Sequence, residues 1–403
     1  MTTPRALIVG MGIGGLAAAM RLHEIGWETV VVERAPSRRP AGYFVGLFET
    51  GRATAQRMGL LDAIGNRASD DGITYDIDRW GKRRPGMGYG DLPGDPRLIL
   101  RGDIEAALYD AVAPHLNVRY HTTPTRIDEH PATVEVTLRT GTGPDATESQ
   151  ETFDLVVGAD GMRSTVRRLV FGPDTAFMKP LHHIIGAAIL KENVPGYRPQ
   201  DGLVLAEPGR SVWTFPFSNH QPGVLFNYRT HDEDAQFRRP PIESLRAAFG
   251  PQPTGPALEH LLNQFEQADD YLFDSVHQVH MNTWHTGRTV LLGDAAWCLT
   301  LYSGLGASTA LAGADLLGTL LQRNGPNITR ALREWDQRLR PFITHQQHDG
   351  RTQGLKMFVP QSSKDKALRT LTQTLLSRPA GKRVMKKLAA RQFNEKAIDI
   401  AAP

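Results

Sequence analysis

Residues 5–34 read RALIVGMGIGGLAAAMRLHEIGWETVVVER and decide the fold. The order is a short apolar strand, a glycine turn, an alanine-rich helix, a second strand and an acid. Gly10, Gly12 and Gly15 satisfy G-x-G-x-x-G, whose glycines turn the chain, admit a pyrophosphate and let the helix pack on the strand. Glu33 stands where an acid accepts hydrogen bonds from a ribose. We therefore predict a dinucleotide-binding β-α-β unit rather than an ordinary tight turn followed by a chance glutamate.

Composition limits the possible partners and compartment. The chain has 403 residues, with 46 basic and 43 acidic side chains. Because no long basic run accompanies this small excess, we expect a small-molecule ligand and no nucleic acid. Cys298 is the single cysteine, which excludes an intrachain disulfide and favours the reducing cytoplasm. The apolar stretch Leu7–Met20 is shorter than the ~20 residues of a membrane span, so we predict no integral membrane segment. We also predict no metal site.

The patterns along the chain predict an α/β fold: a Rossmann-like dinucleotide-binding domain, an inserted mixed β-sheet substrate domain and C-terminal helices. Residues 101–116 read as a helix with Asp103 as a candidate N-cap, and residues 118–130 and 132–141 read as a strand pair. The basic, amphipathic end of the chain reads as a solvated helix face, with a membrane or partner surface as the alternative. The predicted division is 1–71, 99–175 and 286–345 for the dinucleotide-binding domain, 72–98 and 176–285 for the substrate domain, and 346–403 for the C-terminal helical region.

Two further segments run from a strand through a Gly/Asp turn into a helix. They are DLVVGADGMRSTVR at 154–167 and GRTVLLGDAAW at 287–297. This geometry brings acids and backbone N–H groups to a nucleotide. With the glycine turn, the three segments over residues 5–345 resemble the FAD-dependent class A monooxygenases, the family of para-hydroxybenzoate hydroxylase and the tetracycline-inactivating monooxygenases.

The resemblance implies a resident FAD, and it makes the Rossmann-like dinucleotide-binding domain an FAD-binding domain. It assigns the first glycine turn and Glu33 to the ADP half, Arg101 to the ribityl-phosphate portion, Asp160 to the pyrophosphate side and Asp294 to the ribityl chain. The alternatives are a surface arginine at 101 and simple helix caps at the two aspartates. The full set of cofactor candidates is Gly10, Gly12, Ile13, Gly14, Gly15, Glu33, Arg34, Arg101, Asp160, Gly161, Gly293, Asp294, Gly304, Leu305, Gly306 and Ala307.

The turn Ser303–Gly306 opens a helix, and a helix N-terminus stabilises an anion such as a reduced flavin. The alternative is a turn that serves packing alone. Many relatives have a histidine after GDAA and prolines before this turn, whereas residues 297–302 read WCLTLY here. The loop is therefore bulkier and lacks proline stiffening. We interpret Cys298 as a buried small hydrophobe and not a nucleophile.

The resemblance also implies a reaction. NAD(P)H, either NADPH or NADH, would dock transiently and reduce the flavin, and O₂ would then form a C4a-hydroperoxide that hydroxylates an aromatic or polycyclic small molecule. No dedicated catalytic acid or base stands out, since the flavin carries the chemistry. His182 and His183 are candidate bases for a phenol, although strand-edge histidines are the simpler interpretation. Aromatic side chains suit a flat substrate, although strand aromatics also fill cores; the candidates are Phe44, Trp213, Phe215, Phe217, Phe226 and Tyr302.

Four other functions compete with this hypothesis. A flavin-dependent halogenase would carry W-x-W-x-I-P, which residues 213–217 echo only faintly, and a lysine that AGYFVGLFETG lacks. A flavin reductase of unsaturated substrates would put no oxygen into its product. An NAD-dependent dehydrogenase would leave the segments around Asp160 and Asp294 unexplained. A non-catalytic flavin or nucleotide sensor would show no substrate-accelerated NAD(P)H oxidation. The sequence leaves substrate identity, regiochemistry and oligomeric state open.

Overall fold

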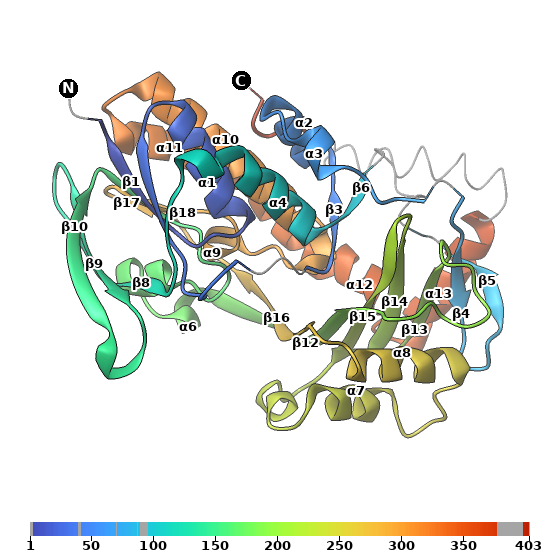
Figure 1. Cartoon of the computed structure of the whole chain (residues 1–403). Helices are drawn as coiled ribbons and strands as arrows, with labels where there is room; N and C mark the ends of the chain where they lie inside the picture. Colours follow the sequence, from blue (N-terminus) through green and yellow to red (C-terminus); the bar gives the residue numbers. More distant parts are fainter. Residues whose placement is uncertain are drawn as a thin grey trace.

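The structure is a computed structural model that describes residues 3–38, 42–69, 71–86, 88, 96–376 and 398–402. It is an elongated α/β molecule with two large sheets at opposite ends (Figure 1). The first sheet has the order β17-β18-β11-β1-β2-β7, in which every pair is parallel except β17 with β18. Its strands are β1 (Arg5–Val9), β2 (Glu28–Val32), β7 (Asn117–Arg119), β11 (Leu155–Gly158), β17 (His285–Thr286) and β18 (Thr289–Leu291).

Helices gather on one side of this sheet. The central strands β1, β2 and β11 are almost continuously apolar and buried, as expected for a parallel sheet covered by other layers. Figure 1 shows the covering helices together above the sheet. They are α1 (Ile13–Glu24), α4 (Arg101–Val112), α10 (Gly306–Asn324) and α11 (Ile328–Asp349).

A three-stranded antiparallel sheet stands beside the first. It contains β8 (Thr122–Glu129), β9 (Val134–Thr140) and β10 (Thr147–Phe153), and the pairing of β8 with β9 confirms the predicted strand pair. Asp103 is not the N-cap of α4, because the helix begins two residues earlier at Arg101. Its carboxylate accepts a hydrogen bond from the backbone N–H of Leu100 at 2.9 Å, so it caps the helix from the third position.

The second large sheet has seven strands in the order β16-β12-β15-β14-β13-β4-β5. Residues 74–85 of the predicted range 72–98 lie in this sheet. The last strand of that range pairs elsewhere, because β6 (Arg97–Leu100) forms a two-stranded sheet with β3 (Phe44–Leu47). The seven strands are β4 (Thr74–Ile77), β5 (Arg83–Pro85), β12 (Met178–Ile189), β13 (Gly202–Glu207), β14 (Arg210–Phe217), β15 (His220–Arg229) and β16 (Tyr271–Val279).

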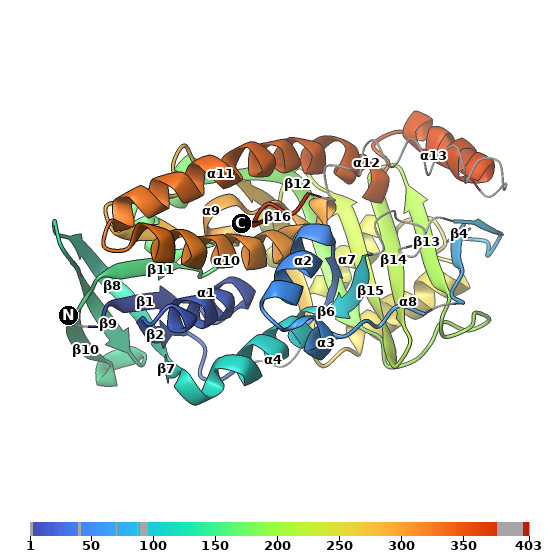
Figure 2. The same ribbon diagram turned by 90° about the horizontal axis from the view of Figure 1, so that it is seen from above.

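The two faces of this second sheet have different neighbours. Helices α7 (Pro241–Phe249) and α8 (Pro256–Glu266) cover one face, where they share a core cluster with the strands. Figure 2 shows α12 (Leu355–Phe358) and α13 (Ser363–Leu376) on the opposite face. We call the face under α7 and α8 the helix-covered face of this sheet.

A buried ion cluster secures one end of β13 and β14. Glu207 accepts hydrogen bonds from Arg79 Nη2 and from Arg210 Nε, both at 2.7 Å. Burial raises the pKa of Glu207, but the two guanidinium groups more than offset it and bring the pKa down to about 2. We call Glu207, Arg79 and Arg210 the Glu207 cluster.

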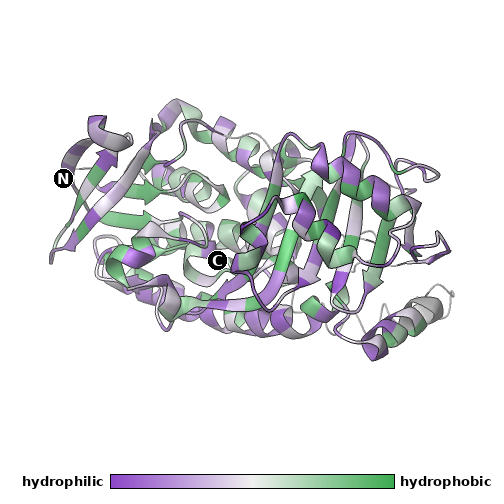
Figure 3. Ribbon diagram, turned by 90° about the horizontal axis from the view of Figure 1, so that it is seen from below, coloured by the Kyte–Doolittle hydropathy of each residue, from purple (hydrophilic) through white to green (hydrophobic). Residues whose placement is uncertain are grey.

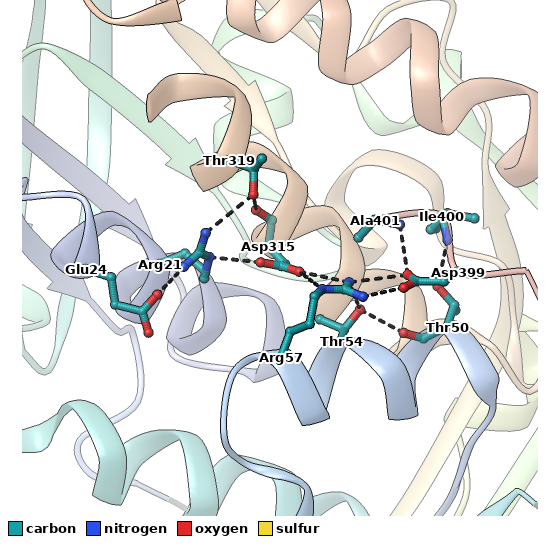
Figure 4. A network of polar contacts seen from close by, with 10 residues as sticks. All are labelled: Arg21, Glu24, Thr50, Thr54, Arg57, Asp315, Thr319, Asp399, Ile400 and Ala401. Atoms are coloured by element: carbon teal, nitrogen blue, oxygen red, sulfur yellow. Dashed lines mark hydrogen bonds and ion pairs between the residues drawn. The ribbon is translucent and has the colours of Figure 1, made fainter. Parts of the chain in front are cut away.

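The C-terminal segment returns to the first half of the molecule. Asp315 on α10 lies 2.9 Å from Arg21 Nε of α1 and 2.9 Å from Arg57 Nη2 of α2 (Glu49–Arg57). Arg57 also pairs with Asp399, and the backbone N–H of Ile400 donates to Thr50 Oγ1 at 3.3 Å. Figure 4 shows these contacts joining the two helices, α10 and the end of the chain. We call Asp315, Arg21, Arg57 and Asp399 the Asp315 network.

Hydrophobic residues concentrate on the strands of both sheets, and hydrophilic residues mark the outer faces of the helices (Figure 3). No helix within the described ranges is long and apolar enough to cross a bilayer. The basic stretch in residues 377–397 lies outside the described residues. The remaining short elements are α3 (Leu61–Ile64), α5 (Thr165–Val170), α6 (Asp174–Phe177), α9 (Asp294–Trp297), η2 (Ala113–His115), η3 (Gly143–Asp145), η4 (Asp234–Phe237), η5 (Leu301–Ser303) and η6 (Gly350–Gly354).

Candidate functional site

One cavity of about 900 Å³ extends from the first sheet to the second. The carboxyl ends of parallel strands are the usual place for a ligand in such folds. Here the turns that follow β1, β2, β11 and β18 all line the cavity. All the predicted cofactor residues line the cavity except Gly15, which packs against the backbone of Gly10, and Leu305, which is fully buried.

The glycine turn has the geometry that its pattern predicts. Gly10 has a φ of +101°, and a Cβ there would lie 2.5 Å from the carbonyl oxygen of Ala159. A Cβ on Gly15 would lie 1.9 Å from the carbonyl oxygen of Gly10, so only glycine lets α1 approach the turn this closely. Gly12 is the N-cap of α1. The N-terminus of this helix, with its free N–H groups, therefore faces the cavity.

Glu33 holds the glycine turn in place. Its Oε2 accepts a hydrogen bond from the backbone N–H of Met11 at 3.0 Å, and its Oε1 accepts one from Ala35 at 2.8 Å. A carboxylate offers about four acceptor positions, so two remain for ribose hydroxyls. The neighbouring Arg34 is exposed and lines the same end of the cavity.

Two arginines stand opposite the glycine turn. Arg101 is the first residue of α4, and its Nη2 donates to Glu105 Oε1 at 2.6 Å. Burial raises the pKa of Glu105, while the charge of Arg101 opposes that rise. Arg38, which sequence reasoning missed, lies over the ring of Tyr109 at 4.6 Å, and its buried Nε has no hydrogen-bond partner among the described residues. The sequence feature that could have identified Arg38 as a site residue is the arginine-rich loop that leads from the second strand toward the ligand.

The space between these groups fits a pyrophosphate. A Cβ on Gly12 would point into it, 3.6 Å from Arg101 Nη2, so glycine leaves room for a ligand oxygen. An unpartnered buried guanidinium nitrogen and a helix N-terminus both favour an anion. The residues present therefore fit the phosphate portion of a dinucleotide.

Asp160 uses its carboxylate mainly as a helix cap. Its Oδ1 accepts from Ser164 Oγ at 2.6 Å, and its Oδ2 accepts from the backbone N–H groups of Thr165 at 2.6 Å and Val166 at 3.2 Å. Burial raises the pKa of Asp160, and these hydrogen bonds oppose the rise. Gly161 has a φ of +78°, and no atom lies within 4 Å of its Cβ position. A ligand can therefore approach the backbone of this turn.

Asp294 faces the cavity beside the start of α10. It follows Gly293, whose φ is +64°, and a Cβ on Gly306 would lie 4.0 Å from Asp294 Oδ1. Burial raises the pKa of Asp294, and the charge of Arg101 opposes that rise. Nearby, burial raises the pKa of the Cys298 thiol well above its usual range, so this thiol stays protonated and is a poor nucleophile.

The turn before α10 lies against the π-helical turn η6. Gly304 adopts a left-handed conformation with a φ of +70°, and Gly306 and Ala307 line the cavity. Inside η6, a Cβ on Gly354 would lie 2.3 Å from the carbonyl oxygen of Tyr302. A π-helical turn often marks a functional site, and no sequence pattern predicted this one.

Three aromatic rings form the far wall of the cavity. Phe44 and Phe215 stack with their centroids 3.9 Å apart and their planes within 4°, and both line the cavity. Phe358, which sequence reasoning missed, joins them from α12. Trp213 lies behind this wall, where it stacks on Phe215 and donates from Nε1 to the carbonyl oxygen of Phe358 at 3.2 Å.

The other three predicted substrate contacts are core residues away from the cavity wall. Phe226 lies on the helix-covered face of its sheet, with its ring edge-on to Phe249 and Phe265. Its neighbour Leu225 lines the cavity instead, because adjacent strand residues point to opposite faces. Phe217 packs in a separate cluster with Leu98 and Leu100. Tyr302 is buried, with its hydroxyl 3.5 Å from Asn227 Oδ1, and burial raises its pKa.

Strand β16 supplies three polar residues of the cavity wall, which sequence reasoning also missed. Asp274, Ser275 and His277 line the cavity, and Asp274 pairs with Arg163 through two hydrogen bonds of 2.8 and 2.6 Å. The two histidines proposed as bases lie elsewhere. His182 is 61% exposed, and His183 is buried with its Nδ1 2.6 Å from the carbonyl oxygen of Leu181.

Comparisons with known proteins agree with this arrangement. The FAD binding domain family matches residues 3–324. A flavin-dependent monooxygenase from an unknown prokaryotic organism is 27% identical over 354 residues, covering 86% of this chain and 88% of its own. The flavin-dependent monooxygenase eupH of Phoma sp is 29% identical over 401 residues, covering 90% and 89%.

Two solved structures share the fold. Tetracycline destructase Tet(51) superposes with a TM-score of 0.74 at 24% identity, covering 97% of this chain and 98% of its own. Klebsiella pneumoniae HpxO in complex with FAD and uric acid superposes with a TM-score of 0.73 at 18% identity, covering 99% and 97%. The family match over most of its length shows that this chain belongs to the FAD binding domain family, and the resemblance to the class A flavin-dependent monooxygenases is confirmed.

Proposed function

We propose that this chain is an FAD-dependent hydroxylase that uses NAD(P)H and O₂ to oxygenate an aromatic or polycyclic small molecule. The observation that carries the proposal is one continuous cavity, with a dinucleotide cradle at one end and the stacked rings of Phe44 and Phe215 at the other. The cavity is large enough, at about 900 Å³, for an extended cofactor and a small substrate beside it.

Different residues of the chain would hold different parts of FAD. Glu33 would accept hydrogen bonds from the ribose, Gly12 and Arg101 would face the pyrophosphate, and Asp294 would bind the ribityl chain. When bound, FAD supplies redox chemistry with NAD(P)H and O₂ that amino-acid side chains lack. The start of α10 at Gly306 points at the cavity, and its dipole would stabilise negative charge there.

The wall residues would orient the substrate and exclude water. Flat rings stack well against Phe44 and Phe215, and Phe358 closes the same wall from α12. Apolar residues on the sheet face complete the enclosure, and exclusion of water favours oxygen transfer over wasteful release of peroxide. The polar groups of β16, including His277, are the points at which a substrate hydroxyl can be recognised.

The relatives support the same assignment. Two carry the name flavin-dependent monooxygenase, and the HpxO structure contains FAD with uric acid, a flat heterocycle. We extend only the class of ligand to this chain, namely a planar small molecule.

The first test is the purified protein. We expect the two visible absorbance bands of bound oxidised flavin, and their absence after reconstitution with FAD would refute the proposal. A panel of aromatic and polycyclic compounds should contain members that accelerate NAD(P)H oxidation, with ¹⁸O from ¹⁸O₂ in the product. A product that lacks ¹⁸O but is reduced indicates a flavin reductase, and a halide-dependent product indicates a halogenase.

A further inference from the structure

A short irregular stretch of backbone forms part of the cavity wall just after Asp294. It consists of residues 297–300, which are the last residue of α9 and the three-residue loop that follows it. We call it the 297–300 segment. Two of its members, Cys298 and Thr300, line the cavity. Residues 297–302 contain no proline, so hydrogen bonds and packing must supply the rigidity that a proline ring would give.

Two buried glutamines hold two carbonyl oxygens of this segment. Gln347 on α11 donates from Nε2 to the carbonyl oxygen of Trp297 at 3.1 Å. Gln278 on β16 donates from Nε2 to the carbonyl oxygen of Leu299 at 3.5 Å. The segment is therefore held from a helix on one side and from a strand of the second large sheet on the other.

The other two carbonyl oxygens of the segment are also hydrogen-bonded. The backbone N–H of Val279 donates to the carbonyl oxygen of Cys298 at 3.3 Å, and Ser303 Oγ donates to that of Thr300 at 3.0 Å. Thr300 has a φ of +69° and a ψ of 162°, a conformation that is nearly confined to glycine. A threonine keeps this conformation only where its surroundings hold it.

The two glutamines also hold each other's elements together. Gln278 Nε2 donates to the backbone carbonyl oxygen of Gln347 at 2.8 Å, and Gln347 Nε2 donates to that of Val279 at 2.6 Å. A primary amide nitrogen has two N–H donors, so each side chain contacts one carbonyl of the segment and one of the facing element. His280 Nε2 lies 3.0 Å from Gln278 Oε1, which fixes the orientation of that amide. We call Gln278 and Gln347 the glutamine clamp.

We propose that Gln278 and Gln347 are positioning residues that hold the 297–300 segment rigid beside the cofactor end of the cavity. Neither glutamine lines the cavity, so both act through the segment. The clamp keeps Thr300 in its unfavourable conformation and keeps Cys298 and Thr300 in the wall. The rigidity of the segment follows from these hydrogen bonds alone, whereas its consequence for oxygenation rests on the proposed function.

Hydrogen–deuterium exchange of the FAD-loaded full chain, followed by mass spectrometry, measures this rigidity. Methionine is close to glutamine in size but has no N–H donor, so Gln347→Met removes two hydrogen bonds and keeps the packing. We expect peptides that cover residues 297–303 to exchange about tenfold faster, with peptides from β1 unchanged. Gln278→Met should have the same effect. The control is Gln264→Met, which replaces a buried glutamine whose Oε1 accepts from the backbone N–H of Lys191 at 2.8 Å.

The control should leave exchange in the 297–300 segment as it is in the wild type. Unchanged exchange of the segment in both clamp variants, or equal acceleration in Gln264→Met, overturns the proposal. In Gln347→Met we also expect a changed visible circular dichroism spectrum of bound FAD and, with a stimulating substrate, more of the NAD(P)H electrons released as H₂O₂. If exchange rises while both of these stay at wild-type values, the clamp does not position the cofactor. If no compound stimulates NAD(P)H oxidation, the proposed function fails, while exchange still decides the clamp.

Discussion

Substitution of Asp315 by asparagine should destabilise the fold, because it removes the negative charge that Arg21 and Arg57 share. The carboxylate is only 7% exposed and lies 2.9 Å from both Arg21 Nε and Arg57 Nη2 (Figure 4). Exposed ion pairs contribute up to about 1 kcal/mol, whereas removal of one partner from a buried pair costs about 3–5 kcal/mol. Since the two arginine side chains are 18% and 29% exposed, we expect a loss of about 2 kcal/mol.

The assay is urea unfolding followed by circular dichroism, with saturating FAD in every sample because bound ligand stabilises the folded state. The matched control is Asp269→Asn. Asp269 pairs with Lys191, and the Asp269 side chain is 90% exposed. We expect the control to stay within about 0.5 kcal/mol of wild type. If Asp315→Asn changes the free energy of unfolding no more than the control does, the Asp315 network does not hold α1, α2 and the C-terminal segment together.

Three further predictions follow from single positions. Gly15→Ala should weaken FAD binding more than tenfold in a fluorescence titration, because its Cβ would lie 1.9 Å from a backbone oxygen. The control is Gly14→Ala, whose Cβ would meet only ordinary contacts at 3.6 Å and which should bind FAD normally. Phe226→Ala should cost about 3–4 kcal/mol of stability and leave KM unchanged. Phe215→Ala should instead raise KM for the substrate. If Phe226→Ala raised KM and Phe215→Ala did not, the assignment of the cavity to the face of Phe215 would be wrong. The depressed pKa of Glu207 should contribute about 3 kcal/mol of stability above pH ~4.5, lost as the pH falls through about 2, so the stability gap between wild type and Glu207→Gln should close in acid.

Local pattern explains why the residues predicted to bind the cofactor lie together along one cavity. Gly10, Gly15 and Glu33 belong to one β-α-β unit, so their relative positions follow from the unit itself. Asp160 and Asp294 come from distant segments, yet each follows a strand of the same sheet, and strand ends meet at one edge. Their chemistry was harder to predict, since the carboxylate of Asp160 is used in capping α5.

The substrate end could not be predicted in the same way, because a strand residue's face depends on pairing and on what covers the sheet. Phe215 and Phe226 are both strand aromatics, but only the register of β15 decides that Leu225 faces the cavity and Phe226 faces the helices. Phe358 comes from a helix beyond the family match. No local pattern linked it to Phe44, more than 300 positions earlier.

The adjacent histidines of β12 show why irregular backbone matters most at such a site. In a regular strand, His182 and His183 would point to opposite faces, and alternation alone would leave open which one met the substrate. The bulge between Pro180 and Ile184 sends His183 into the core and His182 out to Glu233. Neither then touches the cavity, and His277 on the neighbouring strand occupies the wall instead. His182 lies 3.5 Å from Glu233 Oε1 instead, so the surroundings of His182 depend on a residue that no local pattern around it contains.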